Sequence, residues 1–129
     1  MSIRISNNIS CKFNDCKLHS KAETKEWKIV LTGVLDKDSK AYELFGSTEI
    51  TERHRHRYEV NNDYRNVLVQ NGMKLCGMSP DGRIVEMIEL PANLFHMATQ
   101  AHPELKSRPN RPHPLFSGFI KAALEHENK

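Results

Sequence analysis

A short hairpin in the middle of the chain constrains the fold more than any other feature. Two β-rich runs, residues 73–78 and 83–90, flank the turn sequence Ser-Pro-Asp-Gly at residues 79–82. Proline followed by Asp-Gly between such runs is typical of a β-hairpin. The second run carries apolar residues on both of its alternating faces, so we expect it to be covered on both sides. A strand of this kind is typical of a layered α/β domain.

The rest of the chain supplies strands and helices around this hairpin. We expect a buried strand over residues 27–35, an extended segment over 49–60 and a short strand over 94–99. An asparagine caps a predicted short helix over 61–72. Apolar residues recur at helical spacing over 115–124. The order of strand, helix, hairpin, strand and helix predicts an α/β fold.

Length and composition place the chain among single-domain globular proteins. It has 129 residues, of which 38% are hydrophobic and 27% charged, with a formal charge of +3. The N-terminus has no apolar core of a signal peptide, and no apolar stretch is long enough to span a bilayer, so we expect a cytoplasmic protein without a membrane partner. Composition changes near residue 40. We therefore divide the chain into an unassigned, irregular segment, 1–40, and a domain, 41–129; within the first, 1–26 is expected to be loop.

The cysteines give no pattern that indicates a disulfide framework or a zinc site. The chain has three, Cys11, Cys16 and Cys76, and no CxxC. None lies in a Gly-x-Cys-x-Gly setting, the sharp turn that presents a nucleophile beside backbone amides. Cys76 falls on a predicted strand, where a buried, inert thiol is expected. If the protein uses a cysteine as a nucleophile, we therefore expect that cysteine to be absent from this chain.

Residues 53–57 form the unusual run Arg-His-Arg-His-Arg. On a strand, the arginines would share one face and the histidines the other. A nucleic-acid patch would need aromatic platforms that are missing, and a metal site at His54 and His56 would need a third ligand. The arginines could instead bind carboxylates. Spacing alone favours a charged edge strand that resists aggregation, and leaves the other three interpretations open.

The tripeptide His102-Pro103-Glu104 follows a predicted apolar strand. A histidine with a carboxylate two residues later could form the base and orienting group of nucleophilic catalysis. The carboxylate would hold one imidazole nitrogen while the other nitrogen faces a thiol. The alternative is a loop histidine beside a solvated glutamate. The tripeptide alone favours this alternative, because short motifs often match by accident.

Two long strings carry a family resemblance. The segment ITERHRHRYEVNNDYRNVLVQNGMKLCGMSPDGRIVEMIELP, followed by ATQAHPELKSRPNRPHPLFSGFIKAAL, resembles the C-terminal end of the CTP synthase family, the bacterial form in particular. The resemblance is colinear over residues 41–125. It implies an α/β fold, specifically the C-terminal half of a flavodoxin-like class I glutamine amidotransferase domain, and an incomplete one.

The resemblance also implies an activity and a set of site residues. CTP synthases join an amidoligase domain to a glutaminase domain, whose Cys-His-Glu triad releases ammonia from glutamine to convert UTP to CTP. It implies that His102 and Glu104 are the triad histidine and glutamate, and that Arg57 helps to bind the glutamine substrate. ATP and Mg²⁺ belong to the absent synthetase domain, so no cofactor or metal is implied in this chain. No nucleic-acid partner is implied either.

The chain departs from the family pattern near the site. Ala101 and Leu105 stand where the family usually has phenylalanine, and the stretch expected before residue 41 is not recognisable. Because the turn that carries the family's catalytic cysteine is also missing, we expect the chain alone to be inactive. Two alternatives stay open: a non-catalytic paralogue that docks on another subunit, and a split enzyme whose second chain supplies the missing half. An ordered strand over residues 27–35 would favour the paralogue over a fusion scar.

Overall fold

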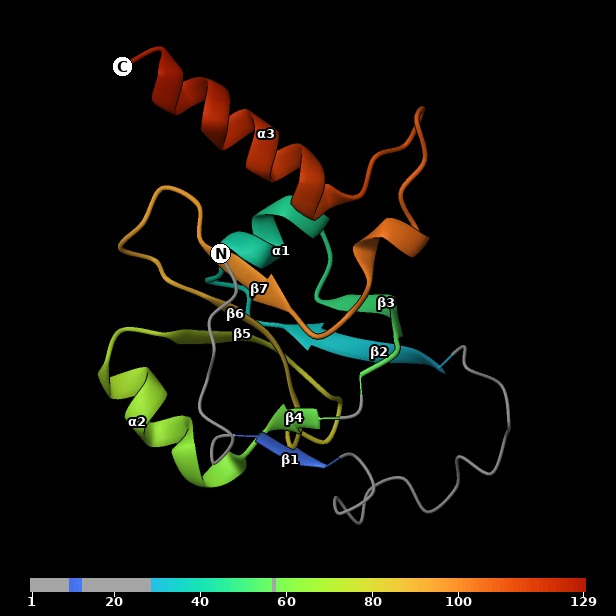
Figure 1. The fold of residues 1–129 in the computed structure, drawn as a ribbon, viewed down its shortest axis with the longest axis vertical. Helices are drawn as coiled ribbons and strands as arrows, with labels where there is room; N and C mark the ends of the chain where they lie inside the picture. Colours follow the sequence, from blue (N-terminus) through green and yellow to red (C-terminus); the bar gives the residue numbers. More distant parts are fainter. Residues whose placement is uncertain (1–9, 13–28, 57) are drawn as a thin grey trace.

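The computed structural model describes residues 10–12, 29–56 and 58–129, drawn as a ribbon in Figure 1. Strands, α-helices and two short 3-10 helices alternate along this part of the chain. The elements are β1 (Ser10–Lys12), β2 (Ile29–Leu35), α1 (Lys40–Phe45), β3 (Glu49–His54), β4 (Tyr58–Val60), η2 (Asn62–Tyr64), α2 (Arg65–Gln70), β5 (Lys74–Met78), β6 (Val85–Glu89), β7 (Met97–Thr99), η3 (Pro103–Leu105) and α3 (Pro114–Glu127).

Five strands form the main sheet, in the order β3-β2-β5-β6-β7. Every neighbouring pair in it is antiparallel. The predicted hairpin is confirmed as β5 and β6. Its turn is closed by the backbone N–H of Ser79, which donates to the Ile84 carbonyl at 2.9 Å. Gly82 has a positive φ of 71°, a conformation that favours glycine.

The main sheet curls so that its two outer strands meet at one end. His54, the last residue of β3, forms an isolated β-bridge with Ala101, just after β7. The backbone N–H of His102 then donates to the carbonyl of Arg53 at 2.8 Å. The sheet is therefore a half-barrel, and its closure brings the tripeptide 102–104 against β3.

Helices cover the sheet from both sides (Figure 1). In that view α1 and α3 lie above the sheet, whereas α2 and the separate β1–β4 pair lie below it. Strand β6, between these layers, is buried at Val85, Glu86, Met87 and Glu89, so it is covered on both sides as predicted, although two of these four residues are glutamates. The mixed α/β fold predicted from the sequence is therefore confirmed.

The hydrophobic core lies between the sheet and α1 with α3. Its buried members are Leu35, Ala41, Cys76, Met87 and Leu115. Helix α3 packs closely on α1 at Gly118, where an added Cβ would lie 2.7 Å from Cδ2 of Leu44. This close approach sets the position of α3, and with it the loop that carries residues 102–113.

Some predicted elements differ from the observed ones. The extended segment 49–60 is two strands, β3 and β4, which belong to different sheets. Ser10–Lys12 forms β1 within the stretch expected to be loop, because backbone pairing with β4 holds it without any side-chain period. Residues 29–35 of the predicted strand 27–35 form β2, which pairs with both β3 and β5. Trp27 and Lys28 lie outside the described residues.

Candidate active site

His102 and Glu104 lie together at the end of the half-barrel. The Nδ1 atom of His102 is 2.7 Å from Oε1 of Glu104. Proline at the first position of η3 fixes the turn between them. Both side chains are exposed, by 41% and 58% respectively. Because Nδ1 faces the carboxylate, Nε2 is left available to a reacting group.

The carboxylate of this pair stays ionised at neutral pH. The hydrogen bond from His102 is the main reason that the pKa of Glu104 lies below its usual value, and a backbone hydrogen bond and the charge of Arg55 add to it. An ionised Glu104 keeps the imidazole proton on Nδ1, so Nε2 of a neutral ring carries a lone pair. The geometry therefore fits the predicted base and orienting group, while their catalytic roles remain a prediction.

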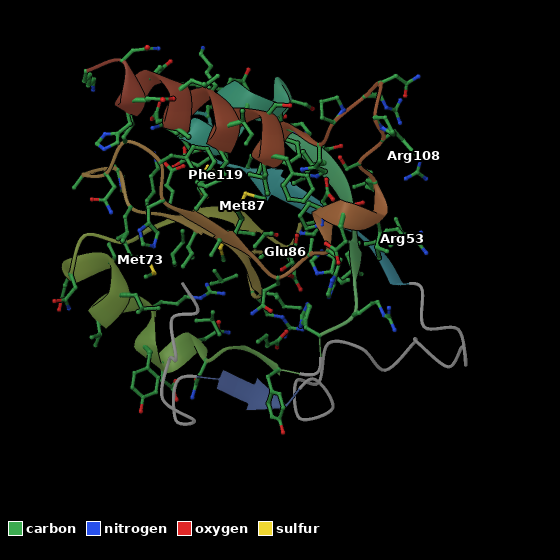
Figure 2. All side chains as sticks on the ribbon, turned by 45° about the horizontal axis from the view of Figure 1, so that its top comes forward. Arg53, Met73, Glu86, Met87, Arg108 and Phe119 are labelled. Atoms are coloured by element: carbon green, nitrogen blue, oxygen red, sulfur yellow. The ribbon has the colours of Figure 1, made fainter. Side chains whose placement is uncertain are left out.

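Backbone contacts to β3 hold this pair in place. Besides the bond from His102 to Arg53, the ammonium group of Lys106 donates to the carbonyl of Thr51. The same ammonium lies 3.6 Å from Oε1 of Glu52. Figure 2 shows Arg53 and Arg108 at the edge of the molecule that carries η3. Sequence reasoning missed these contacts, because nothing in the local pattern indicates that β3 and η3 are neighbours.

A second histidine–carboxylate pair also involves β3, through Glu52. Nε2 of His113 is 2.9 Å from Oε1 of Glu52, and both side chains are buried. Nδ1 of His113 accepts from the backbone N–H of Leu115, which places the ring proton on Nε2 and caps α3. Sequence reasoning missed this pair. The one available signal was a histidine directly before a proline at the entry to the helix.

The Arg-His-Arg-His-Arg run does not lie on one strand, because β3 ends at His54. The expected alternation holds within β3, where His54 is buried and Arg53 only half-buried. Nδ1 of His54 is 3.1 Å from Nε2 of His56, so the two rings are joined by a hydrogen bond. Burial, followed by the neighbouring His56, lowers the pKa of His54 to about 4. Arg57 lies outside the described residues.

Cys76 is a buried thiol, as expected. It is fully buried in β5, and burial together with the charge of Glu89 raises its pKa to about 12. A thiol with this pKa stays protonated at neutral pH and is a poor nucleophile. Cys16 lies outside the described residues. The geometry gives Cys76 a packing role in the core.

The described part of the chain contains neither a metal-binding cluster nor a membrane-spanning helix. Within residues 10–12, 29–56 and 58–129, no group of three His, Cys, Asp or Glu side chains is arranged to hold a metal ion. Of the helices that the structure describes, none is long and apolar enough to cross a membrane.

Comparison with known proteins decides the family. A family model described as "Glutamine amidotransferase class-I" matches residues 16–122. The chain belongs to this family. CTP synthases from Staphylococcus aureus strains JH9 and Newman are 60% identical to it over 87 residues, which is 67% of this chain and 16% of each relative. The chain thus spans less than a fifth of the curated relatives that it matches.

A solved structure agrees with this assignment. The glutaminase domain of Trypanosoma brucei CTPS, with bound acivicin, superposes with a TM-score of 0.72 at 33% sequence identity. The match covers 76% of this chain and 39% of that one. The predicted class I amidotransferase fold and the resemblance to the CTP synthase glutaminase domain are therefore both confirmed.

Proposed function

We propose that this chain supplies the general base and its orienting carboxylate to a CTP synthase-type glutaminase. In the complete reaction, ammonia released from glutamine would aminate UTP to CTP with ATP. The observation that carries the proposal is the 2.7 Å hydrogen bond between His102 and Glu104 at an exposed position beside β3. Membership of the class I amidotransferase family, and the identity to CTP synthases over 87 residues, support the reaction.

Each residue has its own part in the proposed chemistry. With Glu104 holding the Nδ1 proton, Nε2 of His102 can take the proton of a thiol that attacks the glutamine amide. The imidazolium, stabilised by Glu104, then returns that proton to the departing ammonia. We propose Arg57 as the residue that binds the glutamine carboxylate, through the paired hydrogen bonds that guanidinium groups form. The thiol and the oxyanion hole would come from a second chain.

A chimera tests these roles. Residues 41–125 replace the matching segment of an intact CTP synthase, and CTP formation is measured with glutamine and with free ammonia. His102→Ala should abolish synthesis from glutamine and spare synthesis from ammonia, because ammonia bypasses the hydrolytic step. Glu104→Ala should act in the same direction but less severely. Arg57→Ala should chiefly raise the glutamine requirement, by about 1.5–3 kcal/mol of binding.

The matched control in this experiment is Lys121→Ala, which changes an exposed side chain of α3 within residues 41–125. It should leave synthesis from either nitrogen source unchanged. Equal losses with ammonia and with glutamine in the His102 variant would show that His102 holds the domain together and does not act on the substrate.

One observation supports a second candidate function, a non-catalytic module that docks on another subunit. Strand β2 precedes the segment 41–125 and is hydrogen-bonded on both sides within the main sheet. The sequence before residue 41 thus contributes to the sheet, as a self-sufficient module requires. A module should unfold as a monomer in one sharp, cooperative transition, whereas a chain that needs a second half should melt broadly and bind hydrophobic dyes.

A further inference from the structure

The turn that carries His102 and Glu104 is held together by its own backbone. η3 lies between His102 and Lys106, and two hydrogen bonds span it. The N–H of Leu105 donates to the His102 carbonyl at 3.1 Å, and the N–H of Lys106 donates to the Pro103 carbonyl at 3.0 Å. Because a 3-10 turn closed in this way has little internal freedom, whatever fixes Lys106 also limits where the His102 ring can lie.

Strand β3 holds both ends of this turn. At the first end, the backbone N–H of His102 donates to the Arg53 carbonyl at 2.8 Å. At the second end, the ammonium group of Lys106 donates to the Thr51 carbonyl. The residue between these two carbonyls is Glu52, which is 4% exposed. Glu52 is therefore the residue of β3 that adjoins both attachment points.

The carboxylate of Glu52 connects the two ends of the loop that follows the turn. Its Oε1 atom lies 3.6 Å from Nζ of Lys106 and 2.9 Å from Nε2 of His113. Within the loop, the backbone N–H of His113 donates to Oγ of Ser107 at 3.1 Å. Lys106 begins this loop and His113 ends it, so a single buried oxygen restrains both ends against β3.

The other oxygen of Glu52 has room for a donor inside the sheet. Oε2 is buried without a hydrogen-bond partner among the described residues, and so is Nε2 of His54. Nδ1 of His56 donates to the Tyr58 carbonyl at 2.9 Å, so with both rings neutral His54 donates to His56 through Nδ1 and can accept at Nε2. Glu52 and His54 line a cavity of about 10 Å³, room for about one water, whose two hydrogens suit these two acceptors.

We propose that Glu52 is a positioning residue, which anchors the turn 102–106 to β3 and thereby keeps the hydrogen bond between His102 and Glu104 in place. Glu52 acts through Lys106 and the loop, and it touches no reacting atom. When the turn loosens, Glu104 no longer fixes the proton on Nδ1. The ring then also adopts the form protonated on Nε2, which cannot act as a base there. This inference rests on the proposed glutaminase role of His102.

Two variants weaken the anchor and leave the core filled. Lys106→Met removes the ammonium group from a side chain that is 40% exposed. Glu52→Gln keeps the shape of the side chain and can still accept from His113. Glu89→Gln is the matched control, because it makes the same change at another glutamate that is 4% exposed, whose carboxylate accepts from the backbone at the start of α1.

The ¹⁵N resonances of the His102 ring in the 129-residue chain report the effect, measured at a pH where the ring is neutral. In the unaltered chain the ring should be almost wholly in the Nδ1–H form. The Nε2–H form should rise several-fold in the Glu52→Gln and Lys106→Met variants. Lys106→Arg keeps a cationic donor and should restore the original ratio, and Glu89→Gln should not change it.

The CTP synthase chimera links the ring to turnover. Glu52→Gln and Lys106→Met should each lower kcat with glutamine by about tenfold or more, because a small misplacement of a reacting group is costly. The KM for glutamine and the synthesis from ammonia should stay unchanged, since the substrate contacts and the synthetase domain are intact. An equal loss of synthesis from ammonia would overturn the proposal, because it would reveal a general loss of structure.

Two outcomes of the ring measurement would also overturn the proposal. An unchanged ratio of the two ring forms in both the Glu52 and the Lys106 variants would show that Glu52 only fills the interior. An equal rise of the Nε2–H form in the Glu89→Gln variant would show that loss of any buried carboxylate loosens the turn. The proposed function fails by a different result, glutamine-dependent synthesis that survives His102→Ala, and the ring measurement then still decides whether Glu52 positions the pair.

Discussion

Two histidine–carboxylate pairs lie close to the same end of β3, and they differ in burial far more than in geometry. His102 and Glu104 are 2.7 Å apart and exposed, whereas His113 and Glu52 are 2.9 Å apart and only 3% and 5% exposed. The exposed pair leaves a ring nitrogen available to a substrate. The buried pair uses both ring nitrogens within the fold, one for Glu52 and one for the cap of α3.

This comparison shows that a short distance between histidine and carboxylate does not by itself indicate catalysis. In water an exposed ion pair contributes little to the free energy of folding, so its use to the protein lies in the chemistry that it can perform. In the interior the same interaction replaces lost hydration, and removing one partner leaves the other uncompensated. The pair in which a free ring nitrogen meets solvent is therefore the candidate for chemistry, and the buried pair supports its position.

Breaking the buried pair should have the largest effect. His113→Ala removes the donor to Glu52 and the cap of α3, and should lower the free energy of unfolding by about 3–5 kcal/mol. Urea denaturation at pH 7 measures it. His102→Ala is the matched control from the exposed pair and should change stability by no more than about 0.5 kcal/mol. Equal losses in the two variants would remove the distinction between the pairs.

The pH dependence of stability extends the comparison to other buried groups. Burial raises the pKa of Glu86 from 4.5 to about 7 and lowers that of His54 from 6.5 to about 4. As the pH rises between the two pKa values of Glu86, the unfolded state loses a proton that the folded state keeps, so the unfolding free energy falls by about 3 kcal/mol. As the pH falls between the two pKa values of His54, the unfolded state gains a proton that the folded state does not bind, and the unfolding free energy again falls by about 3 kcal/mol.

The two changes in unfolding free energy should cancel over the pH range that they share, and single variants should separate them. In the Glu86→Gln variant, stability should fall on acidification from pH 6.5. In the His54→Gln variant, it should fall as the pH rises from 4.5 to 7. Urea unfolding at a series of pH values follows both profiles. Parallel profiles in the two variants would show that burial does not shift these pKa values in opposite directions.

The smallest effect is expected at the carboxylate of the exposed pair. Glu104→Gln keeps the shape of the side chain and removes its charge, and should lower the unfolding free energy only slightly, because the pair is exposed to water. Because salt screens exposed charges, that difference should shrink further in 1 M NaCl. Urea unfolding at low and high salt measures it. A loss of unfolding free energy comparable to that of His113→Ala would mean that the exposed pair also stabilises the fold.

Much of the fold follows from local signals. The hairpin β5–β6, the strand β2 and the apolar face of α3 were predicted because turn residues, β-branched runs and helical periods act over a few positions. The family resemblance added the pairing of His102 with Glu104. The break between β3 and β4 was not predicted, because alternating charges continue through residues 53–57 while the chain moves from one sheet to another.

The sequence alone therefore determined most of the elements and the family, and it predicted the two residues of the exposed pair. Tertiary structure alone decided which groups are buried together. Glu52 and His113 are 61 positions apart, and they meet only because the curled sheet and the packing of α3 close over them. His54 and Glu86 share a cavity for the same reason. Burial and partnership of polar groups depend on closure of the whole sheet, and no local pattern in the chain encodes that closure.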